Sequence, residues 1–342
     1  MTQCFRLPPE WAQQQAVLIS WPHAQTDWAK ILPFIYPCYT DMARAITQSA
    51  RLIIVAPNAA EVKTILADAV DMDLVSIYEI PTNDTWARDF GPISVTDGEH
   101  WRLLDYKFNG WGLKFPACFD NLITRNLIAQ GAFMDGEYAN RLNFVLEGGS
   151  IDIDADGTLL TTEECLLSPN RNGGSTKEQI EQHLIEDLGA SKVIWLTRGA
   201  IIGDDTDSHI DTLARFLPGG IIAYAACDRP DDPNYAELKA MEQELEQATN
   251  AAGEPYRLVP LYLPHTQHDF HGEPTPATYA NFLLLNGTVL LPTYRDPYYD
   301  ALAQEAIAEA LPGWKIIPIE CRYLTFQHGS LHCATMQLPL FK

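Results

Sequence analysis

The chain has 342 residues, 46% of them hydrophobic, and 45 acidic against 23 basic side chains give it a formal net charge of −22. This negative charge argues against binding to nucleic acid or an anionic membrane, whereas it suits a cationic ligand as well as plain solubility. No apolar run approaches the roughly 20 residues that span a bilayer, the N-terminus lacks a secretory signal pattern, and the seven Cys without C-x-x-C spacing indicate reduced thiols, so we expect a cytoplasmic protein.

The first predicted elements are two β-branched, apolar strands at residues 16–22 and 51–57, with an amphipathic helix at 36–50 between them. A hairpin turn, TDG, follows at Gly98. Further turns of the same kind end at Gly157, Gly220 and Gly287, where glycine supplies a positive φ. The four turns are 59, 63 and 67 residues apart, which indicates repeated modules.

The segment after each of the last three turns reads strand, helix, strand. The predicted ranges are 158–164, 175–189 and 192–197, then 221–226, 235–252 and 256–263, then 288–294, 298–313 and 314–320. With the strand before each turn, every module reads ββαβ. The first module, after Gly98, is less regular and ends in a strand at 141–149.

A fifth module requires both ends of the chain. Its first strand would be SLHCATMQL at 330–338, paired with the N-terminal strand at 16–22. A ring closed in this way leaves no open sheet edge. We therefore predict a single α/β domain over 1–342, built from five pseudo-symmetric modules and closed by both termini.

Polar residues recur at the start of each module's first strand. Equivalent ends of pseudo-symmetric modules meet at one pole, so we expect these side chains to converge there. They are Asp89, Glu147, Asp211 with His209 two residues earlier, Asn281 and Cys333. Each has an ordinary alternative: the carboxylates and Asn281 as turn or strand caps, His209 as a satisfied core histidine, and Cys333 as a small buried residue of the last strand.

A Cys, a His and several carboxylates at one pole favour covalent catalysis with the His as acid and base. Acyl transfer has no use for several anions around its electrophilic carbon. A guanidinium does, because carboxylates accept its fork of N–H donors and its charge lowers the pKa of a neighbouring thiol. The pattern therefore predicts a guanidine as substrate.

Five stretches resemble the guanidine-modifying penteins, in the branch of agmatine deiminases and bacterial peptidylarginine deiminases. They are NDTWARDFGP (83–92), LEGGSIDIDADGTLLTTEECLLSPNRN (146–172), WLTRGAIIGDDTDSHIDTLARF (195–216), YANFLLLNG (279–287) and HGSLHCATMQ (328–337). LPPEW (7–11) and LISWPH (18–23) are similar to the family's opening. The resemblance implies a five-bladed α/β propeller, consistent with the module count.

The resemblance also implies roles for these residues. Cys333 would be the nucleophile and His209 the general acid and base, Asp89 and Asp211 would hold the guanidinium, and Glu147 would orient His209 or contact substrate nitrogens. Trp86 would lie along the substrate stem, and Asn281 matches a polar site position. Attack by Cys333 would give an S-alkylthiouronium, which water hydrolyses to a ureido product without a cofactor. Ser208 and His328–Ser330 depart from the family's glycine-rich pattern.

Agmatine is the expected substrate, because the Arg that a free α-carboxylate needs cannot be assigned among Arg171, Arg198 and Arg295. A peptidylarginine or other guanidine is the alternative. Two readings outside this chemistry are a metal-dependent hydrolase, with zinc on His265, His268, His271 and Glu273, and a non-catalytic polyamine-binding propeller. We expect no metal, nucleic-acid or membrane partner, and a homo-oligomer is compatible with the sequence.

Overall fold

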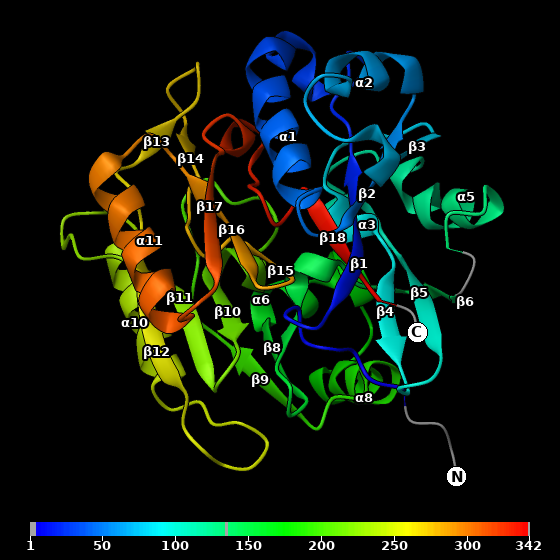
Figure 1. Cartoon of the computed structure of the whole chain (residues 1–342). Coiled ribbons are helices and arrows are strands. Elements are labelled where there is room, and N and C mark those ends of the chain that lie inside the picture. Colours follow the sequence, from blue (N-terminus) through cyan, green and yellow to red (C-terminus); the bar gives the residue numbers. More distant parts are fainter. Residues whose placement is uncertain (1–4, 134–135, 341–342) are drawn as a thin grey trace.

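The computed structural model describes residues 5–133 and 136–340, so the ends of the predicted 1–342 domain, residues 1–4 and 341–342, lie outside the described residues. Within the described part, five mixed sheets of three or four strands and one two-stranded hairpin form an α/β structure (Figure 1). Figure 1 shows the longer helices at the periphery and the sheets toward the middle. No described helix has both the length and the apolar character to cross a bilayer.

Four of the sheets repeat one topology, in which two antiparallel strands are followed by a third that pairs in parallel with the second. The repeat confirms the predicted order of strands around the four glycine turns. The sheets consist of β4 (Ile93–Thr96), β5 (Trp101–Lys107) and β6 (Glu137–Val145); β7 (Asp152–Ile153), β8 (Thr158–Thr162) and β9 (Lys192–Leu196); β10 (Ala214–Leu217), β11 (Ile221–Ala226) and β12 (Arg257–Tyr262); and β15 (Leu283–Leu285), β16 (Thr288–Thr293) and β17 (Lys315–Glu320).

The turn glycines adopt the expected left-handed backbone, with φ of 97° at Gly98, 83° at Gly157, 70° at Gly220 and 78° at Gly287. Helices lie on the connections between the parallel strands of these sheets. They are α4 (Gly110–Leu113) and α5 (Ile123–Ala129); α6 (Glu163–Leu166), α7 (Pro169–Asn172) and α8 (Lys177–Leu188); α10 (Tyr235–Leu245); and α11 (Pro297–Ala310). Short 3₁₀ turns complete the connections at η1 (Asp27–Lys30), η2 (Met72–Leu74), η3 (Asp120–Leu122), η4 (Gly148–Ser150) and η5 (Leu324–Gln327).

Helix α8 shows how the sequence directs these elements. Thr176 and Gln179 form a reciprocal capping box at its start, and Gly189, with φ of 65°, ends it. Its buried face consists of Ile180, Leu184 and Leu188, one residue per turn.

The predicted helix 235–252 was too long at its C-terminal end. Helix α10 ends at Leu245, because Asn250 Oδ1 accepts hydrogen bonds from the backbone N–H groups of Ala252 and Glu254 and so holds a tight turn instead. The N-terminal helix, in contrast, begins four residues before the predicted start: α1 spans Leu32–Ile46. Pro33 in its first turn lacks the N–H that a helix start would leave unpaired.

The fifth sheet joins the two ends of the described chain, as predicted. Strand β18 (Thr335–Pro339) pairs antiparallel with β1 (Gln14–Ser20), in a register that sets Ile19 opposite Thr335, and β2 (Arg51–Ala56) continues in parallel. The sequence did not reveal the next elements, α2 (Ala59–Leu66) and a fourth strand, β3 (Val75–Glu79). Figure 1 shows β18 and β1 side by side.

The placement of the polar residues in strands was wrong. Asp89 lies in the single helical turn α3 (Ala87–Phe90) and Asp211 in α9 (Ile210–Leu213), each just before the first strand of its sheet. Glu147 precedes the turn η4, and Cys333 lies in the turn before β18. A strand would send alternate side chains to opposite faces, whereas a helical turn groups neighbouring side chains and backbone N–H groups around one point.

Candidate active site

Cys333 is one of the residues that line a cavity with about 400 Å³ of empty space, part of which is open solvent. Aromatic side chains and carboxylates both contribute to its lining. The lining residues are Asp27, Asp84, Trp86, Asp89, Trp111, Phe115, Asp205, Thr206, Gln327, His328, Gly329 and Cys333.

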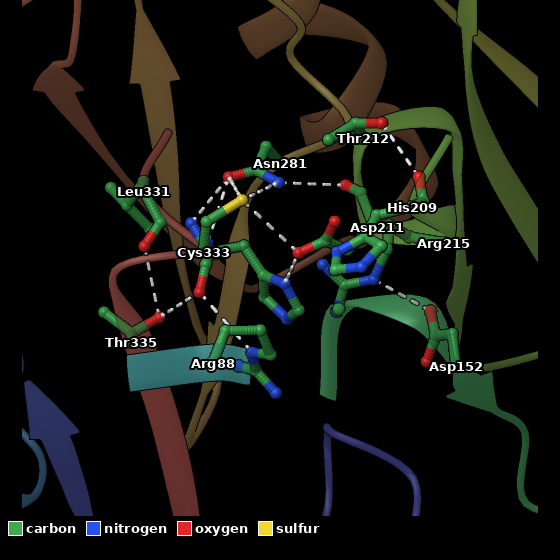
Figure 2. A network of polar contacts seen from close by, with 12 residues as sticks. Arg88, Asp152, His209, Asp211, Thr212, Arg215, Asn281, Leu331, Cys333 and Thr335 are labelled. Carbon is green, nitrogen blue, oxygen red and sulfur yellow. Dashed lines mark hydrogen bonds and ion pairs between the residues drawn. The ribbon is translucent and has the colours of Figure 1, made fainter. Parts of the chain in front are cut away.

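Cys333 is 4% exposed, and its thiol lies between an amide and a carboxylate. Asn281 Nδ2 donates to Sγ at 3.2 Å, and Asp211 Oδ2 lies 3.6 Å from Sγ (Figure 2). Burial raises the pKa of the Cys333 thiol well above its usual range, and the negative charges of Asp211 and Asp89 raise it further. Without a ligand the sulfur is therefore held as a thiol.

Asp89 forms the second carboxylate of the site. It accepts from Gly149 N and from Trp111 Nε1, each at 2.9 Å, and His209 Nδ1 lies 3.6 Å from its Oδ1. Burial raises the pKa of Asp89 above its usual value, against the lowering effect of the His209 cation. Ionised Asp89 in this position is a desolvated anion that requires a cationic partner.

Asp211 is fully buried, and its two oxygens have different surroundings. Oδ2 accepts from His332 Nδ1 at 2.7 Å, whereas Oδ1 has no hydrogen-bond partner in the described part of the chain. Burial would raise the pKa of Asp211, but the hydrogen bond and charge of His332 outweigh it and lower the pKa below its usual value. An ionised, buried oxygen without a donor indicates a site for a ligand N–H.

His209 is also fully buried, and neither of its ring nitrogens makes a hydrogen bond within the described residues. Burial lowers the pKa of His209, but the charges of Asp89 and the neighbouring Cys165 and Glu147 raise it well above its usual range. These charges favour the protonated, acidic form of the imidazole.

Gly149 lies where three of these side chains meet. A Cβ on this residue would be 2.6 Å from His209 Nδ1, 2.8 Å from Asp89 Oδ1 and 3.1 Å from Asp211 Oδ2. The structure therefore brings these three predicted residues together as expected, and only glycine leaves room for them. Gly149 is the second glycine of LEGG, and the sequence alone did not predict that this glycine makes room for the three side chains.

Glu147 has a different environment from the one expected. Its two oxygens accept from Arg171 Nε at 3.0 and 2.9 Å, and both side chains are fully buried. Arg171 also donates hydrogen bonds from Nη1 to Asp207 Oδ2 at 2.5 Å and from Nη2 to Thr206 O at 2.8 Å. Glu147, like His209, Asp211 and Asn281, is not among the residues that line the cavity, and its charge helps to raise the pKa of His209.

Three side chains lie close enough to be considered as metal ligands: Glu147, Cys165 and His209, whose ligand atoms lie within 4.8 Å of one another. The donor set does not fit a cation, because the guanidinium of Arg171 already takes both oxygens of Glu147 and adds a positive charge. The His-rich segment 265–273 forms no such group in the described chain. It forms the hairpin β13 (Gln267–His268) and β14 (Pro274–Thr275), and His265 pairs with Asp296 at 2.7 Å.

The arginines considered for a substrate carboxylate are all engaged elsewhere. Arg171 belongs to the buried pair with Glu147, Arg198 pairs with Glu237 at 2.6 Å, and Arg295 pairs with Glu320 at 2.8 Å. None of the three lines the cavity.

The departures from the family's glycines retain a glycine-like backbone. Ser208 has φ of 61° and His328 has φ of 66°, at a cost of about 1 kcal/mol each. A side-chain hydrogen bond holds each one: Ser208 Oγ to Glu164 Oε2, and His328 Nδ1 to Gly203 O, both at 2.7 Å. Gly329, directly after His328, packs on Trp86, whose ring would lie 2.4 Å from a Cβ at that position.

Trp86 and Asn281 both lie at the site, Trp86 in the cavity wall and Asn281 on the thiol. Trp111 was not anticipated. It lies in a run of left-handed residues, with φ of 70°, 53°, 81° and 70° from Gly110 to Leu113, and this backbone turns its indole toward Asp89. The NGWG sequence is the only local signal for it.

The chain is similar to known proteins along almost its whole length. A model of the Porphyromonas-type peptidyl-arginine deiminase family matches residues 6–339. A Vibrio parahaemolyticus protein, named as a candidate agmatine deiminase, is 35% identical over 356 residues, covering 98% of this chain and 97% of that protein.

Solved structures agree. A candidate arginine deiminase of Porphyromonas gingivalis is 46% identical with a TM-score of 0.91, covering 98% of this chain and 99% of that one. The C. jejuni agmatine deiminase, solved with substrate bound, is 34% identical with a TM-score of 0.90, covering 99% and 96%. A dimethylarginine dimethylaminohydrolase is 13% identical with a TM-score of 0.52 over 95% of this chain and all of that one, which shows a shared fold alone.

Proposed function

We propose that this chain, which belongs to the Porphyromonas-type peptidyl-arginine deiminase family, hydrolyses the guanidinium of agmatine to N-carbamoylputrescine and ammonia. One observation carries the choice of substrate. The cavity that contains Cys333 and Asp89 is also lined by Asp27, Asp84 and Asp205, and no Arg or Lys is among its described lining residues. Agmatine carries a cation at each end, whereas free arginine brings an α-carboxylate that requires a positive partner.

The guanidinium would bind between Asp89 and Asp211. Both carboxylates are buried, and Oδ1 of Asp211 has no donor from the described residues. A planar cation with several N–H groups supplies both the charge and the hydrogen bonds that these oxygens lack. Trp86 and Trp111 form apolar walls for the methylene chain.

Substrate binding would also activate the nucleophile. The charges of Asp211 and Asp89 help to keep Cys333 protonated, and a guanidinium beside them neutralises those charges and attracts a thiolate. Asn281 Nδ2, at 3.2 Å from Sγ, then donates to the negative sulfur. The thiol is thus reactive mainly when the cation is present.

His209 would move the protons. On binding of the cation the thiol proton passes to solvent, and the Cys333 thiolate attacks the guanidinium carbon to give a tetrahedral adduct. Protonated His209 gives its proton to one nitrogen of that adduct, and ammonia departs to leave an S-alkylthiouronium. Neutral His209 then takes a proton from water as the water attacks the same carbon. Collapse of that adduct releases the Cys333 thiolate and the ureido product.

These steps use only side chains and water, so the proposed reaction requires no cofactor. We expect ammonia release to survive exhaustive treatment with a metal chelator. Loss of activity on chelation, restored by zinc, would show that the mechanism is wrong.

We also propose that the sheets form a single five-bladed propeller domain. Support comes from the shared antiparallel-then-parallel strand order and from the pairing of β18 with β1. Each blade would then contribute one polar turn to the same pole.

The experiment is a comparison of ammonia release from agmatine, free arginine and an arginine peptide by the wild type and Cys333→Ser. We expect agmatine to give the highest kcat/KM and Cys333→Ser to be inactive but folded. A preference for the peptide would favour a peptidylarginine deiminase, and full activity in Cys333→Ser would exclude the covalent mechanism.

A further inference from the structure

The LPPEW segment has no part in the reaction above, yet Glu10 within it is 5% exposed and lies at the centre of a buried charge network. Its Oε2 is 2.7 Å from His332 Nε2, 2.8 Å from Arg215 Nη2 and 3.6 Å from Arg88 Nη2. Its Oε1 accepts from Leu284 N at 2.8 Å. A chain segment remote from the catalytic turns thus supplies an anion directly behind them.

His332 connects this anion to the site. Its Nε2 faces Glu10 and its Nδ1 faces Asp211 Oδ2, both at 2.7 Å. A neutral imidazole can donate from only one nitrogen, and ionised carboxylates only accept. If both carboxylates are ionised, the ring between them must carry two protons and a positive charge.

Both carboxylates are held ionised. Burial raises the pKa of Glu10, but the charges of Arg215, His332 and Arg88 outweigh it and hold the pKa far below its usual value. The pKa of Asp211 is lowered as well, because its contact with His332 outweighs its burial. The three side chains therefore alternate in charge: anion, cation, anion.

We propose that Glu10 and His332 are positioning residues, which hold Asp211 ionised and oriented with its unpartnered Oδ1 free for the substrate. The role of Asp211 in this statement rests on the proposed function. Glu10 keeps the second proton on His332, and doubly protonated His332 fixes Asp211 Oδ2. Without Glu10, the Nε2 side of His332 would lose its anionic partner, and the contact of doubly protonated His332 with the buried carboxylate of Asp211 would weaken.

Two arginines also lie near His332. Arg88 Nε donates to the backbone oxygen of His332 at 3.4 Å. Arg215 pairs with Glu10, and it also contacts Asp152 and the backbone oxygen of Phe282, each at 2.8 Å. Both arginines oppose a proton on His332. Glu10 and Asp211 are the groups that retain it.

Nitrogen-15 NMR of the histidine rings tests the charge of His332 without any substrate. The His332→Asn spectrum assigns the resonance among the nine histidines. We expect both ring nitrogens of His332 to carry protons at pH 7 in the wild type, where a carboxylate faces each of them, and only one of them in Glu10→Gln. A wild-type ring with a single proton at pH 7 would overturn the proposal. If Glu10→Gln does not fold, this wild-type measurement decides alone.

The pH profile of kcat/KM tests the consequence. In Glu10→Gln we expect kcat/KM at pH 8 to fall at least about tenfold and its alkaline limb to move to lower pH. Asp105→Asn is the matched control: Asp105 is a buried carboxylate that pairs with Tyr138 and Arg125 away from the site, so its loss should lower stability and leave the profile unchanged. If the pH profile of kcat/KM in Glu10→Gln is the same as that of the wild type, Glu10 has only a structural role and the proposal is wrong. A wild type that releases no ammonia from any guanidine would refute the proposed function, and the NMR result would still stand.

Discussion

Asn281 Nδ2 lies 3.2 Å from Cys333 Sγ, although 52 residues separate the two in sequence. The same amide accepts from His332 N and Cys333 N at 2.9 and 3.2 Å through Oδ1 and donates to Asp211 O at 3.1 Å. A single side chain thus fixes the turn that contains Cys333, the thiol itself and the turn that contains Asp211.

Replacing Asn281 should therefore affect the chemistry. We expect Asn281→Ala to lower kcat/KM for agmatine about 10- to 100-fold, the effect of losing a hydrogen bond to a charged sulfur. Asn281→Asp should be worse still, because a carboxylate at this distance repels a thiolate. Steady-state ammonia release measures both, with circular dichroism as the folding control. Equal activity in the two variants would contradict a donor role for the amide.

Asp89→Asn and Asp211→Asn should each lower kcat/KM. The lost transition-state stabilisation should be about 2 to 5 kcal/mol, because each variant leaves the desolvated cation of the substrate without one anion. A variant within twofold of the wild type would assign its carboxylate a structural role.

Asp211→Asn should have a second, opposite effect. The charge of Asp211 helps to raise the pKa of Cys333, so its removal should make the thiol more reactive in the absence of substrate. Alkylation of the peptide containing residue 333 by iodoacetamide at pH 8, followed by mass spectrometry, should accelerate about threefold to tenfold while turnover falls. If alkylation slows together with turnover, Asp211 does not control the thiol electrostatically.

Asp120 should make stability depend on pH. It is 1% exposed, its Oδ2 has no hydrogen-bond partner within the described residues, and burial raises its pKa to about 8. Between about pH 4 and pH 8 the folded state retains a proton that the unfolded state has lost, so this group reduces stability as pH rises through that window, by about 1.4 kcal/mol per pH unit.

The free energy of unfolding can be measured by urea titration at pH 5, 6.5 and 8. The value for Asp120→Asn should increase relative to that of the wild type as pH rises. The exposed Asp68→Asn is the control and should remain parallel to the wild type. A constant difference between Asp120→Asn and the wild type would show that Asp120 is ionised throughout.

Gly149→Ala should inactivate the enzyme. Its Cβ would lie 2.6 Å from His209 Nδ1, so the imidazole or the backbone must move, and displacements of about 1 Å in a catalytic group cost about 100-fold in rate. Gly98→Ala is the control: its φ of 97° strains the backbone equally or more, but no atom lies within 4 Å of the new Cβ. Retention of activity in Gly149→Ala would contradict the close convergence of His209, Asp89 and Asp211.

The pairing of the chain ends gives a last prediction. Deleting residues 1–21 removes β1, which pairs with both β18 and β2, so we expect aggregation or an inactive protein. A circular permutant that links Lys342 to Met1 and opens between Asp156 and Gly157, in the turn of a hairpin, should fold and release ammonia. The reverse result, an active deletion and an inactive permutant, would contradict the predicted closure.

The sequence by itself determined the modules and most of the site. Turn glycines such as Gly157 and Gly287 impose a backbone that few other residues adopt, so hairpins can be recognised locally. Apolar periodicity then located helices such as α8, and the repeat aligned Asp89, Asp211 and Cys333 although they are distant in sequence. Their convergence needed only pseudo-symmetry.

Only the tertiary structure decided the contacts between modules. Whether Asp211 begins a strand or occupies a helical turn depends on where pairing with β11 starts. Glu147 pairs with Arg171 because a buried anion requires a cationic partner nearby. Glu10 and His332 are 322 residues apart, and no local pattern relates them. Such contacts follow from the packing of one module against another, which is decided by shape and charge in three dimensions and leaves no period in the sequence.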